Sequence, residues 1–330
     1  MNILIVKLSA IGDVIHTLPA LNAIRKKYPN AHITWLVEEA AYPLIYGHPS
    51  IDRILLSKRK RWIKEKNIKE IYKFIKKLRD TKYDIIIDFQ AHLKGAALIL
   101  LAKGVRKIGY DKGMEHDEHS YIFLNERVKP VSMENHAIIR NLMLLEAIGI
   151  DSYEIEYNLP IPDNKINKSN PIIAINPIAK WDTKLWDNIK FACLADRLIE
   201  KYNADIIFTG GPEDHKEVND IMRYMKKDKA HNFSGKTTLK TLAYLYKNAD
   251  IVISTDTGPM HIAAAVNTPV VAIFGPTAPW RTGPYGKINR VVRAETKCSP
   301  CFKRKCNTKE CMAKITVEQV LEEVDWIFHS

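Results

Sequence analysis

One segment that could do chemistry lies near the start of the chain. Residues 9–16 read SAIGDVIH and follow a short apolar run at residues 3–6, and apolar residues recur after them at helical spacing. This pattern predicts a strand, a tight loop and a helix, with the carboxylate of Asp13 near the helix N-terminus. Asp13 could act as a general base. It could equally cap the helix, as acidic residues often do at that position.

A second loop combines a carboxylate with the start of a helix. Residues 254–261 read STDTGPMH, follow an apolar run and open a helical pattern. Backbone amides and the positive end of a helix at such a place can hold a diphosphate. Asp256 would then orient the loop or a ligand hydroxyl. The structural alternative is an ordinary turn and cap, with His261 packed at the helix start.

Two further charged residues follow predicted strands. Lys184 comes after the run that ends at residues 176–177 and could neutralise the charge of a leaving phosphate. Glu213 follows residues 209–212, which read TGGP, and could accept hydrogen bonds from ribose hydroxyls. Either residue could also be a solvated surface side chain.

Several familiar phosphate and metal motifs are missing from the sequence. Residues 234–237 read SGKT but lack the earlier glycine of a Walker A loop, and no Gly-x-Gly-x-x-Gly is present. ATPase and ordinary dehydrogenase activities are therefore disfavoured. The sequence also has no Asp-x-Asp pair to hold a divalent metal on a diphosphate. We therefore expect neither a metal nor a cofactor, with Lys184 and the helix end stabilising the leaving group.

The positive charge of the chain is concentrated in one segment. Of a net charge of +12, residues 58–79 contribute +9, from eleven Lys or Arg and two Glu. A helix is predicted there with Ile68, Ile71, Ile75 and Leu78 inward and lysines outward. Such a surface suits phosphates or an anionic membrane face. A solvated helix face is the alternative, and nucleic acid is a weaker one because no nucleic-acid motif accompanies the charge.

Four of the five cysteines lie close together in the sequence. These four thiols, separated by two, four and four residues, could bind zinc or an iron–sulfur cluster, but this spacing matches no standard four-ligand pattern well. A structural role as reduced thiols is favoured instead. The clustered residues are Cys298, Cys301, Cys306 and Cys311, and Cys193 stands apart.

Strand-like and helix-like segments alternate along the chain, which predicts parallel sheets and an α/β fold. The strand-like runs lie at residues 3–6, 33–37, 85–88, 172–177, 204–211, 251–254 and 270–275. A segment rich in Pro, Asn and Ser at residues 159–171 predicts a linker between two doubly wound domains, 1–160 and 161–330. Ligands of such sheets bind at the carboxyl ends of the strands, so the two domains are expected to face a shared cleft.

The length of 330 residues agrees with two domains. The sequence contains no run of about twenty apolar residues, so neither a transmembrane helix nor a signal peptide is predicted. We therefore expect a cytoplasmic protein.

Three segments together resemble the ADP-heptose lipopolysaccharide heptosyltransferases of glycosyltransferase family 9. They are residues 7–20 (KLSAIGDVIHTLPA), 256–265 (DTGPMHIAAA) and 274–277 (FGPT), and the similarity spans almost the whole chain. Residues 35–39, 88–95, 109–111 and 136–141 look most similar to the heptosyltransferase I subgroup. The chain departs from the family pattern in its cysteine cluster and at residues 182–187, where a proline commonly follows the tryptophan.

The resemblance implies a GT-B fold, with the acceptor bound by the N-terminal domain and the nucleotide sugar by the C-terminal one. A final helix at about 316–328 would cross back to the N-terminal domain. Asp13 matches the catalytic base, and Lys184 would support catalysis at the leaving group. Nucleotide-sugar binding is implied for Lys184, Glu213, Thr237, Asp256, Thr257, Gly258 and His261. Acceptor binding is implied for Arg61, Lys64, Lys94, His136 and Arg140.

The implied reaction is an inverting, metal-independent transfer of heptose from ADP-L-glycero-D-manno-heptose to the Kdo region of the lipopolysaccharide inner core. Peripheral contact with the inner face of the cytoplasmic membrane is expected, and no nucleic-acid partner. Alternatives are heptosyltransferase II or another family 9 transferase with a different donor or acceptor. A nucleotide-sugar hydrolase or epimerase, or a non-enzymatic polyanion-binding protein, would represent other classes.

Overall fold

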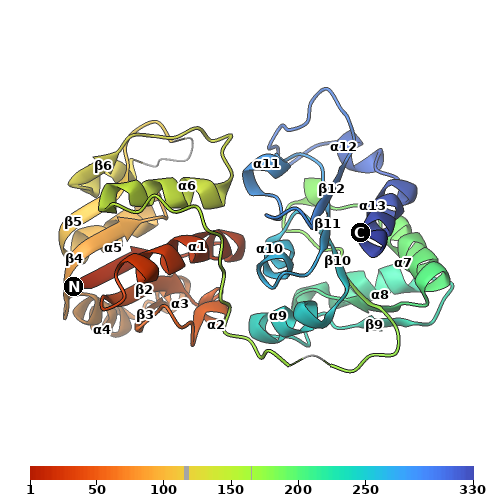
Figure 1. Cartoon of the computed structure of the whole chain (residues 1–330), viewed down its shortest axis with the longest axis horizontal. Helices are drawn as coiled ribbons and strands as arrows, with labels where there is room; N and C mark the ends of the chain where they lie inside the picture. The colour runs from red at the N-terminus through yellow and green to blue at the C-terminus, as the bar shows by residue number, and fades with distance from the viewer. Residues whose placement is uncertain (115–118, 165) are drawn as a thin grey trace. The chain divides into compact units, whose positions relative to one another are not determined.

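The chain forms two compact units, Met1–Pro160 and Ile161–Ser330, each built on one parallel sheet (Figure 1). The computed structural model describes residues 1–114, 119–164 and 166–330. Between residues 149 and 171, the described residues form neither helix nor strand, and the division between the units falls within this stretch. The predicted linker at 159–171 lies in the same stretch.

The first unit contains, within its described residues, six parallel strands in the order β3-β2-β1-β4-β5-β6. The strands are β1 (Asn2–Val6), β2 (His32–Glu38), β3 (Arg53–Ser57), β4 (Lys82–Asp88), β5 (Lys103–Tyr110) and β6 (Glu126–Val128). The helices are α1 (Ile11–Lys27), α2 (Tyr42–Ile45), α3 (Arg59–Glu65), α4 (Ile68–Leu78), α5 (Leu93–Leu101) and α6 (Ala137–Met143), with 3-10 turns η1 (Ser120–Phe123) and η2 (Leu144–Ile148). The apolar residues 3–6 of β1 are fully buried, as expected for a parallel strand covered on both faces.

The second unit repeats this plan, with strands in the order β12-β11-β10-β7-β8-β9. The strands are β7 (Ile172–Asn176), β8 (Asp205–Phe208), β9 (Ala230–Asn232), β10 (Ile251–Thr255), β11 (Val270–Phe274) and β12 (Arg290–Arg293). The helices are α7 (Asn188–Tyr202), α8 (His215–Arg223), α9 (Leu239–Asn248), α10 (Gly258–Ala265), α11 (Pro279–Thr282), α12 (Glu310–Ala313) and α13 (Val317–His329), with 3-10 turns η3 (Asp182–Lys184) and η4 (Pro212–Asp214).

Both sheets have the same doubly wound topology, which confirms the predicted fold class. Counted from its own first strand, each sheet runs 3-2-1-4-5-6, so the order reverses between β1 and β4 and again between β7 and β10. Helices leave the two strands at such a reversal on opposite faces of the sheet. A crevice therefore opens beyond their carboxyl ends, and this is where open α/β sheets bind ligands.

The last helix of the chain belongs to the core of the second unit. It is predicted at about 316–328 and forms as α13, with Thr316 as N-cap accepting a hydrogen bond from the Gln319 amide. Val320, Leu321 and Val324 are buried in the core that α13 shares with α7 and β12. Its return to the N-terminal domain stays a prediction.

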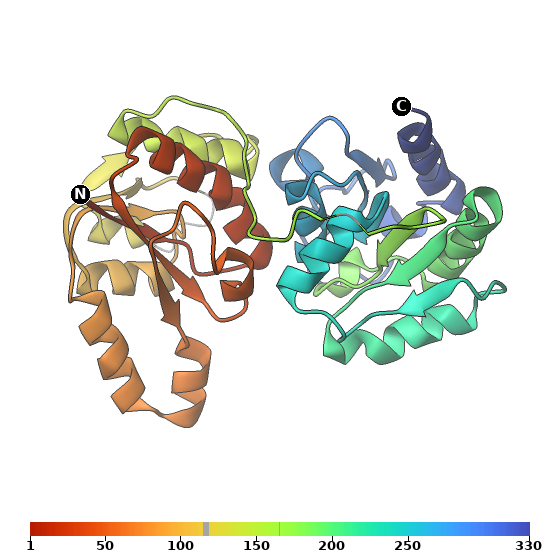
Figure 2. The same ribbon diagram turned by 60° about the horizontal axis from the view of Figure 1, so that its bottom comes forward.

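The basic segment forms a helical hairpin of α3 and α4, which extends from the first sheet (Figure 2). The prediction that Ile68 faces inward is wrong, because its side chain is 76% exposed. The buried line of α4 is set by Phe74 and Leu78. At about 100° per residue, Ile68 points roughly 80° away from Leu78 and so leaves the core. No helix of the described residues has the length and apolar character needed to cross a bilayer.

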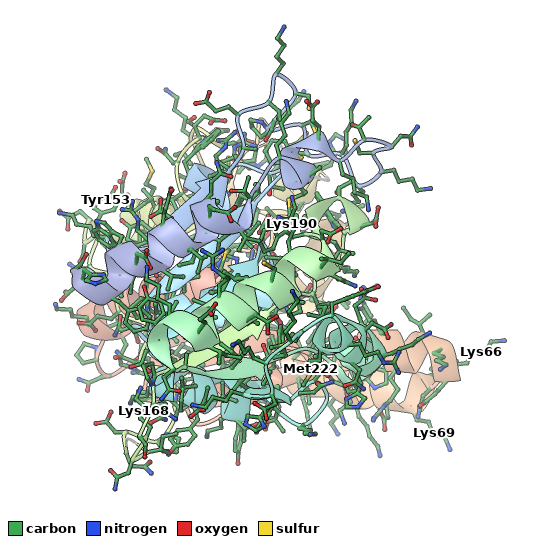
Figure 3. All side chains as sticks on the ribbon, turned by 90° about the vertical axis from the view of Figure 1, so that its right-hand side faces the viewer. Lys66, Lys69, Tyr153, Lys168, Lys190 and Met222 are labelled. Atoms are coloured by element: carbon green, nitrogen blue, oxygen red, sulfur yellow. The ribbon has the colours of Figure 1, made fainter. Side chains whose placement is uncertain are left out.

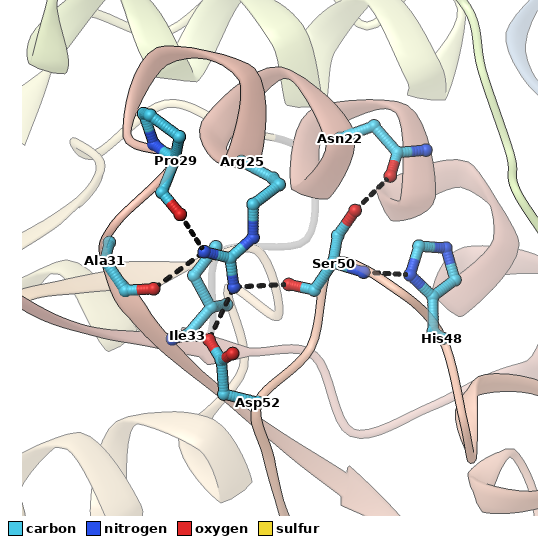
Figure 4. Close-up of polar contacts among 8 residues, drawn as sticks. All are labelled: Asn22, Arg25, Pro29, Ala31, Ile33, His48, Ser50 and Asp52. Carbon is cyan, nitrogen blue, oxygen red and sulfur yellow. Dashed lines mark hydrogen bonds and ion pairs between the residues drawn. The ribbon is translucent and has the colours of Figure 1, made fainter.

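A polar network ties the C-terminal end of α1 to the neighbouring strands (Figure 4). The Arg25 guanidinium donates to the carbonyls of Pro29 (2.9 Å) and Ala31 (2.7 Å) and to the Asp52 carboxylate (2.5 Å). Asp52 also accepts from the Ile33 amide at 2.7 Å. Burial by itself would raise the pKa of Asp52, but the Ile33 amide and the Arg25 charge together hold that pKa below its usual value.

Next to the Arg25 network, Ser50 links α1 to the loop before β3. The Ser50 hydroxyl donates to the Asn22 side chain at 2.8 Å, and the Ser50 amide donates to Nδ1 of His48 at 3.2 Å. Burial lowers the pKa of His48, although a hydrogen bond to the Tyr157 carbonyl opposes the shift. The neutral ring is therefore the form that the network holds.

We expect Asp52→Asn to lower the free energy of unfolding at neutral pH by about 1 kcal/mol, since the pair with Arg25 is partly exposed. Because the pKa of Asp52 is lowered in the folded protein, the folded protein binds a proton on Asp52 less readily than the unfolded chain does. The stabilisation is therefore present above the ordinary aspartate pKa of 3.8 and is lost as pH falls below it. Urea unfolding across this pH range measures the effect. Asp228→Asn, at an exposed aspartate, is the matched control. A difference in unfolding free energy between wild type and Asp52→Asn that does not change with pH would contradict this account.

Candidate functional site

A pocket of the first unit opens at the reversal between β1 and β4. Lys7 and Asp13 reach it from the end of β1, and Asp88 and Gln90 from the end of β4. It is further lined by His16, Phe89, Ala91, His92, Tyr110, Met114, Met133, Ala137, Arg140, Asn141 and Leu144. Its lining thus combines carboxylates with cationic and imidazole side chains.

The loop that leads into the helix of Asp13 is held from the neighbouring strand by one buried side-chain amide, that of Gln90. The side-chain oxygen of Gln90 accepts hydrogen bonds from the backbone amides of Leu8 (2.8 Å) and Ser9 (3.2 Å). These two amides lie between β1 and α1, and among the described residues no strand carbonyl accepts from them. Gln90 therefore fixes the path from the strand into the helix.

Asp13 both caps its helix and lines the pocket. It is the third residue of α1, and its Oδ2 accepts a hydrogen bond from the Ala10 amide at 2.9 Å. The capping interpretation of this residue is thus correct. It does not exclude a chemical role, because the same side chain belongs to the pocket lining.

Lys7 and Asp88 are two buried ionisable residues of the pocket lining that the sequence interpretation missed. Burial raises the pKa of Asp88 to about 6, opposed by hydrogen bonds from the Ala91 and Gln90 amides and by the charge of Lys7. The Lys7 ammonium donates to the Phe89 carbonyl at 2.7 Å. Both residues come at or directly after the end of a buried strand, and this position is the signal that could have identified them.

Three of the proposed acceptor residues lie in or beside this pocket. Arg140 lines it and donates to the carbonyls of Met133 (2.8 Å) and Asn135 (2.9 Å). His136 caps α6, and its ring lies edge-on to the pocket residue His16 at 5.2 Å. Lys94 hydrogen-bonds the hydroxyl of Ser9. Partial burial lowers the pKa of Lys94, although the charge of Glu38 opposes the shift.

Arg61 and Lys64, the other two proposed acceptor residues, lie on α3 and are not among the residues that line this pocket. Arg61 faces three carboxylates, Glu70 at 3.2 Å and Glu39 and Glu65 at 3.9 Å. Lys64 is exposed.

In the second unit, Lys184 and Asp256 meet at the reversal between β7 and β10. The Lys184 ammonium lies 2.5 Å from Asp256 Oδ2, and both side chains are largely buried. The same carboxylate oxygen accepts a hydrogen bond from the Thr277 hydroxyl at 2.5 Å. Lys184 also lies over the ring of Trp181, 4.5 Å from its centroid. Thr277, which follows β11, is a residue that the sequence interpretation did not assign to the site.

The helix after β10 begins beside this pair. Thr257 is the N-cap of α10 and Gly258 its first residue, with Pro259 in the first turn. His261 is buried one turn into the helix. Pro259 has no amide hydrogen, and the Met260 amide donates to the Thr257 carbonyl at 3.2 Å. The anion-binding end next to Lys184 and Asp256 is therefore formed by the amides of Thr257 and Gly258 together with the positive end of the helix.

Glu213 and Thr237 lie on two neighbouring loops of the second unit. Gly235 allows these loops to approach, because it has φ +72° and a Cβ there would lie 2.9 Å from Pro212 Cα. Its amide donates to the Gly210 carbonyl at 3.0 Å. Among the described residues no hydrogen bond joins Glu213 or Thr237 to Lys184 or Asp256.

The cysteine segment braces the loops around Lys184. The amides of Cys301 and Phe302 donate to the Pro276 carbonyl at 2.9 and 2.8 Å, and Thr183 donates to the Lys303 carbonyl at 2.8 Å. All five cysteines are free thiols. Burial and the nearby cysteines raise the pKa of Cys311, whereas the Lys309 amide lowers that of Cys306. Within the described residues, no group of three or more His, Cys, Asp or Glu side chains is arranged to hold a metal ion.

The chain is similar to known proteins over nearly its whole length. Residues 71–312 match the family described as glycosyltransferase family 9 (heptosyltransferase). The lipopolysaccharide core heptosyltransferase OpsX of Haemophilus influenzae is 28% identical over 97% of this chain and 95% of its own length. Lipopolysaccharide heptosyltransferase 1 of Pseudomonas aeruginosa is 27% identical over 93% and 87% of the two chains. Relatives named heptosyltransferase 2 and heptosyltransferase 3, from Campylobacter jejuni and Escherichia coli, match at 26% and 28% identity.

A solved structure has the same architecture. The E. coli heptosyltransferase WaaC, determined with ADP, has a TM-score of 0.84 and 25% identity and covers 99% of this chain and 100% of its own. Because the family match covers well over half of the 330 residues and the two-unit fold is shared, this chain is a glycosyltransferase with the GT-B fold and belongs to family 9, the heptosyltransferases.

Proposed function

We propose that this enzyme transfers a heptose from an ADP-linked donor to the inner core of lipopolysaccharide. The observation that carries the proposal is that each sheet has a polar site at its reversal of strand order. One holds the carboxylate of Asp13, and the other holds Lys184 beside a helix N-terminus. Two relatives are named for lipopolysaccharide heptosyl transfer, and WaaC was solved with ADP and with ADP-2-deoxy-2-fluoro heptose.

The second unit is the proposed nucleotide-sugar domain. The Lys184 ammonium and the backbone amides of Thr257 and Gly258, at the positive end of α10, would hold the diphosphate. Asp256, held by Thr277, would keep Lys184 in place. Glu213, Thr237 and His261 are proposed to contact the nucleoside or the sugar.

The proposed chemistry is a single displacement with inversion. The Asp13 carboxylate takes the proton of an acceptor hydroxyl as that oxygen bonds to the anomeric carbon. The bond from this carbon to the diphosphate oxygen breaks, and ADP leaves with the electron pair. Lys184 and the N-terminal end of α10 at Thr257 and Gly258 stabilise the charge that develops on the diphosphate, so we propose that no divalent metal is required.

The first unit is the proposed acceptor domain. Arg140, Lys94 and His136 lie in or next to the Asp13 pocket and would contact acceptor carboxylates or phosphates. Arg61 and Lys64 would contact more distant phosphates from α3. The Kdo region is the favoured acceptor, as for heptosyltransferase I. Heptosyltransferase II is the alternative, because relatives with different heptosyltransferase names match about equally well. The proposed site of action is the cytoplasmic side of the inner membrane.

The test of the function is release of ADP from ADP-heptose, with and without a delipidated Kdo-terminated acceptor, in excess chelator. Release that depends on the acceptor and survives chelation is the expected result. Release without acceptor would instead identify a hydrolase. If ADP appears only with an acceptor that already carries heptose, the enzyme is a heptosyltransferase II.

Replacing Asp13 by Asn should lower the turnover number by roughly 10²- to 10⁴-fold, the usual contribution of a general base. The amide oxygen of Asn retains the bond to the Ala10 amide, so the helix cap is kept. ADP affinity, measured by titration calorimetry, should stay unchanged because ADP is proposed to bind the second unit. Asp151→Asn, at an exposed aspartate of the same unit, is the control. Wild-type turnover in Asp13→Asn would reject Asp13 as the base.

Thr277→Val should weaken ADP binding by roughly threefold to tenfold, because a hydrogen bond to a charged group is lost. The Asp256 carboxylate would then compete more strongly with the diphosphate for Lys184. Thr277→Ser keeps the hydroxyl and should restore most of the affinity. Lys184→Ala should impair both ADP binding and turnover. Equal ADP affinity of the Val and Ser variants would show that this hydrogen bond does not position the pair.

A further inference from the structure

The α3–α4 hairpin exposes three large apolar side chains among its lysines. Ile63, Ile68 and Tyr72 are 62%, 76% and 69% exposed. The hairpin extends from the first sheet, and Lys66 and Lys69 project from it into solvent (Figure 3). An exposed apolar side chain is unremarkable singly, but three within ten residues of a strongly basic segment require an explanation.

The fold of the hairpin does not need these three side chains. Its internal contacts come from Trp62, whose ring lies 5.0 Å from that of Phe74 and whose indole nitrogen donates to Glu70 at 2.6 Å. Leu78 is fully buried and packs against the hydrophobic core of the first unit. Ile63, Ile68 and Tyr72 are thus available to an external partner.

The exposed residues of α4 are arranged as on a helix that lies in an interface. Ile68 and Tyr72 are four residues apart and form one stripe. At about 100° per residue, Lys69 and Lys76 fall on the side of this stripe that faces away from Phe74 and Leu78, and Lys73 lies further round the helix, where it lines a pocket with Trp62 and Phe74. An apolar stripe bordered by lysines is typical of helices that bind at a bilayer surface.

The lysine charges of the hairpin are not neutralised internally. Arg59 and Arg61 face Glu38, Glu39, Glu65 and Glu70. By contrast, within the described part of the chain none of the exposed lysines of the hairpin forms an ion pair. These are Lys60, Lys64, Lys66, Lys69, Lys73, Lys76 and Lys77.

We propose that the exposed apolar and lysine side chains of the α3–α4 hairpin bind an anionic lipid bilayer. Ile63, Ile68 and Tyr72 enter the headgroup region, and the lysine ammonium groups contact lipid phosphates. A nucleic acid would use the lysines but leave the aliphatic side chains in water, whereas a bilayer satisfies both. The inference rests on the proposed function only in that a lipid-linked acceptor gives the contact its purpose. The binding itself is a property of the free enzyme.

The test is cosedimentation of the full-length protein with vesicles of phosphatidylcholine alone or with about one third phosphatidylglycerol, without substrates. We expect binding to the anionic vesicles that weakens as salt is raised, because exposed charges are screened. The triple variant Ile63→Ser, Ile68→Ser, Tyr72→Ser should lose roughly tenfold or more in affinity. The triple variant Lys69→Gln, Lys73→Gln, Lys76→Gln should lose about fivefold per lysine.

Matched controls come from the second unit. Ile189→Ser with Tyr224→Ser removes two apolar side chains that are 59% and 56% exposed, and Lys216→Gln, Lys226→Gln, Lys227→Gln removes three lysines. Both controls should bind like wild type. Turnover with a delipidated acceptor reports that the hairpin variants are folded, since none of the altered residues is proposed to bind substrate.

Undiminished vesicle binding by the apolar variant would overturn the proposal, as would equal binding to neutral vesicles. Tighter binding to a DNA duplex than to anionic vesicles, unaffected by the apolar variant, would identify a nucleic-acid surface instead. The outcomes remain separable from the proposed function: vesicle binding without heptosyl transfer would reject the function alone, and transfer without vesicle binding would reject this inference alone.

Discussion

Parallel pairing of the two strands at each reversal of order is the contact on which both candidate sites depend. In the first unit Val6 pairs with Asp88, and in the second Asn176 pairs with Ser254. Because the paired strands end in register, the loops that follow them emerge side by side. Asp13 and Gln90 meet for this reason, and so do Lys184 and Asp256, although more than seventy residues separate the members of each pair.

The two sites have the same position on their sheets but differ in how their charged side chains are arranged. The first places Lys7 and Arg140 in the same pocket as its carboxylates, and burial raises the pKa of Asp88 to about 6. The second buries a lysine against a single aspartate that also accepts from Thr277. A buried ion pair is weak support for stability, because desolvation offsets most of the attraction. Its presence beside a helix N-terminus is better explained by the need to receive an anion there.

Much of this arrangement could be predicted from the sequence. The central strands are continuous apolar runs, and Asp13, Lys184 and Asp256 were found because each follows one. Gln90, Thr277 and Asp88 were missed because their importance depends on which strands become neighbours, which no local pattern encodes. Ile68 was placed wrongly for a different reason: the apolar residues of α4 extend around more of the helix than the core can cover. The roles assigned to Arg61, Lys64 and Thr237 rest on the family resemblance alone, and the chemical roles of all the proposed site residues stay predictions.

The first helix is secured at both of its ends. Gln90 holds the backbone just before it, and Arg25 binds its far end to the strands through Asp52 and two carbonyls. Asp13 is therefore not a residue of a mobile loop that could swing toward a substrate by itself. Any approach of its carboxylate to a reacting hydroxyl has to be made by the substrate, or by the whole unit travelling as a rigid body. Apart from changes to Asp13 itself, substitutions that alter this enzyme's rate should therefore be found more often in the stretch that connects the two units than in α1.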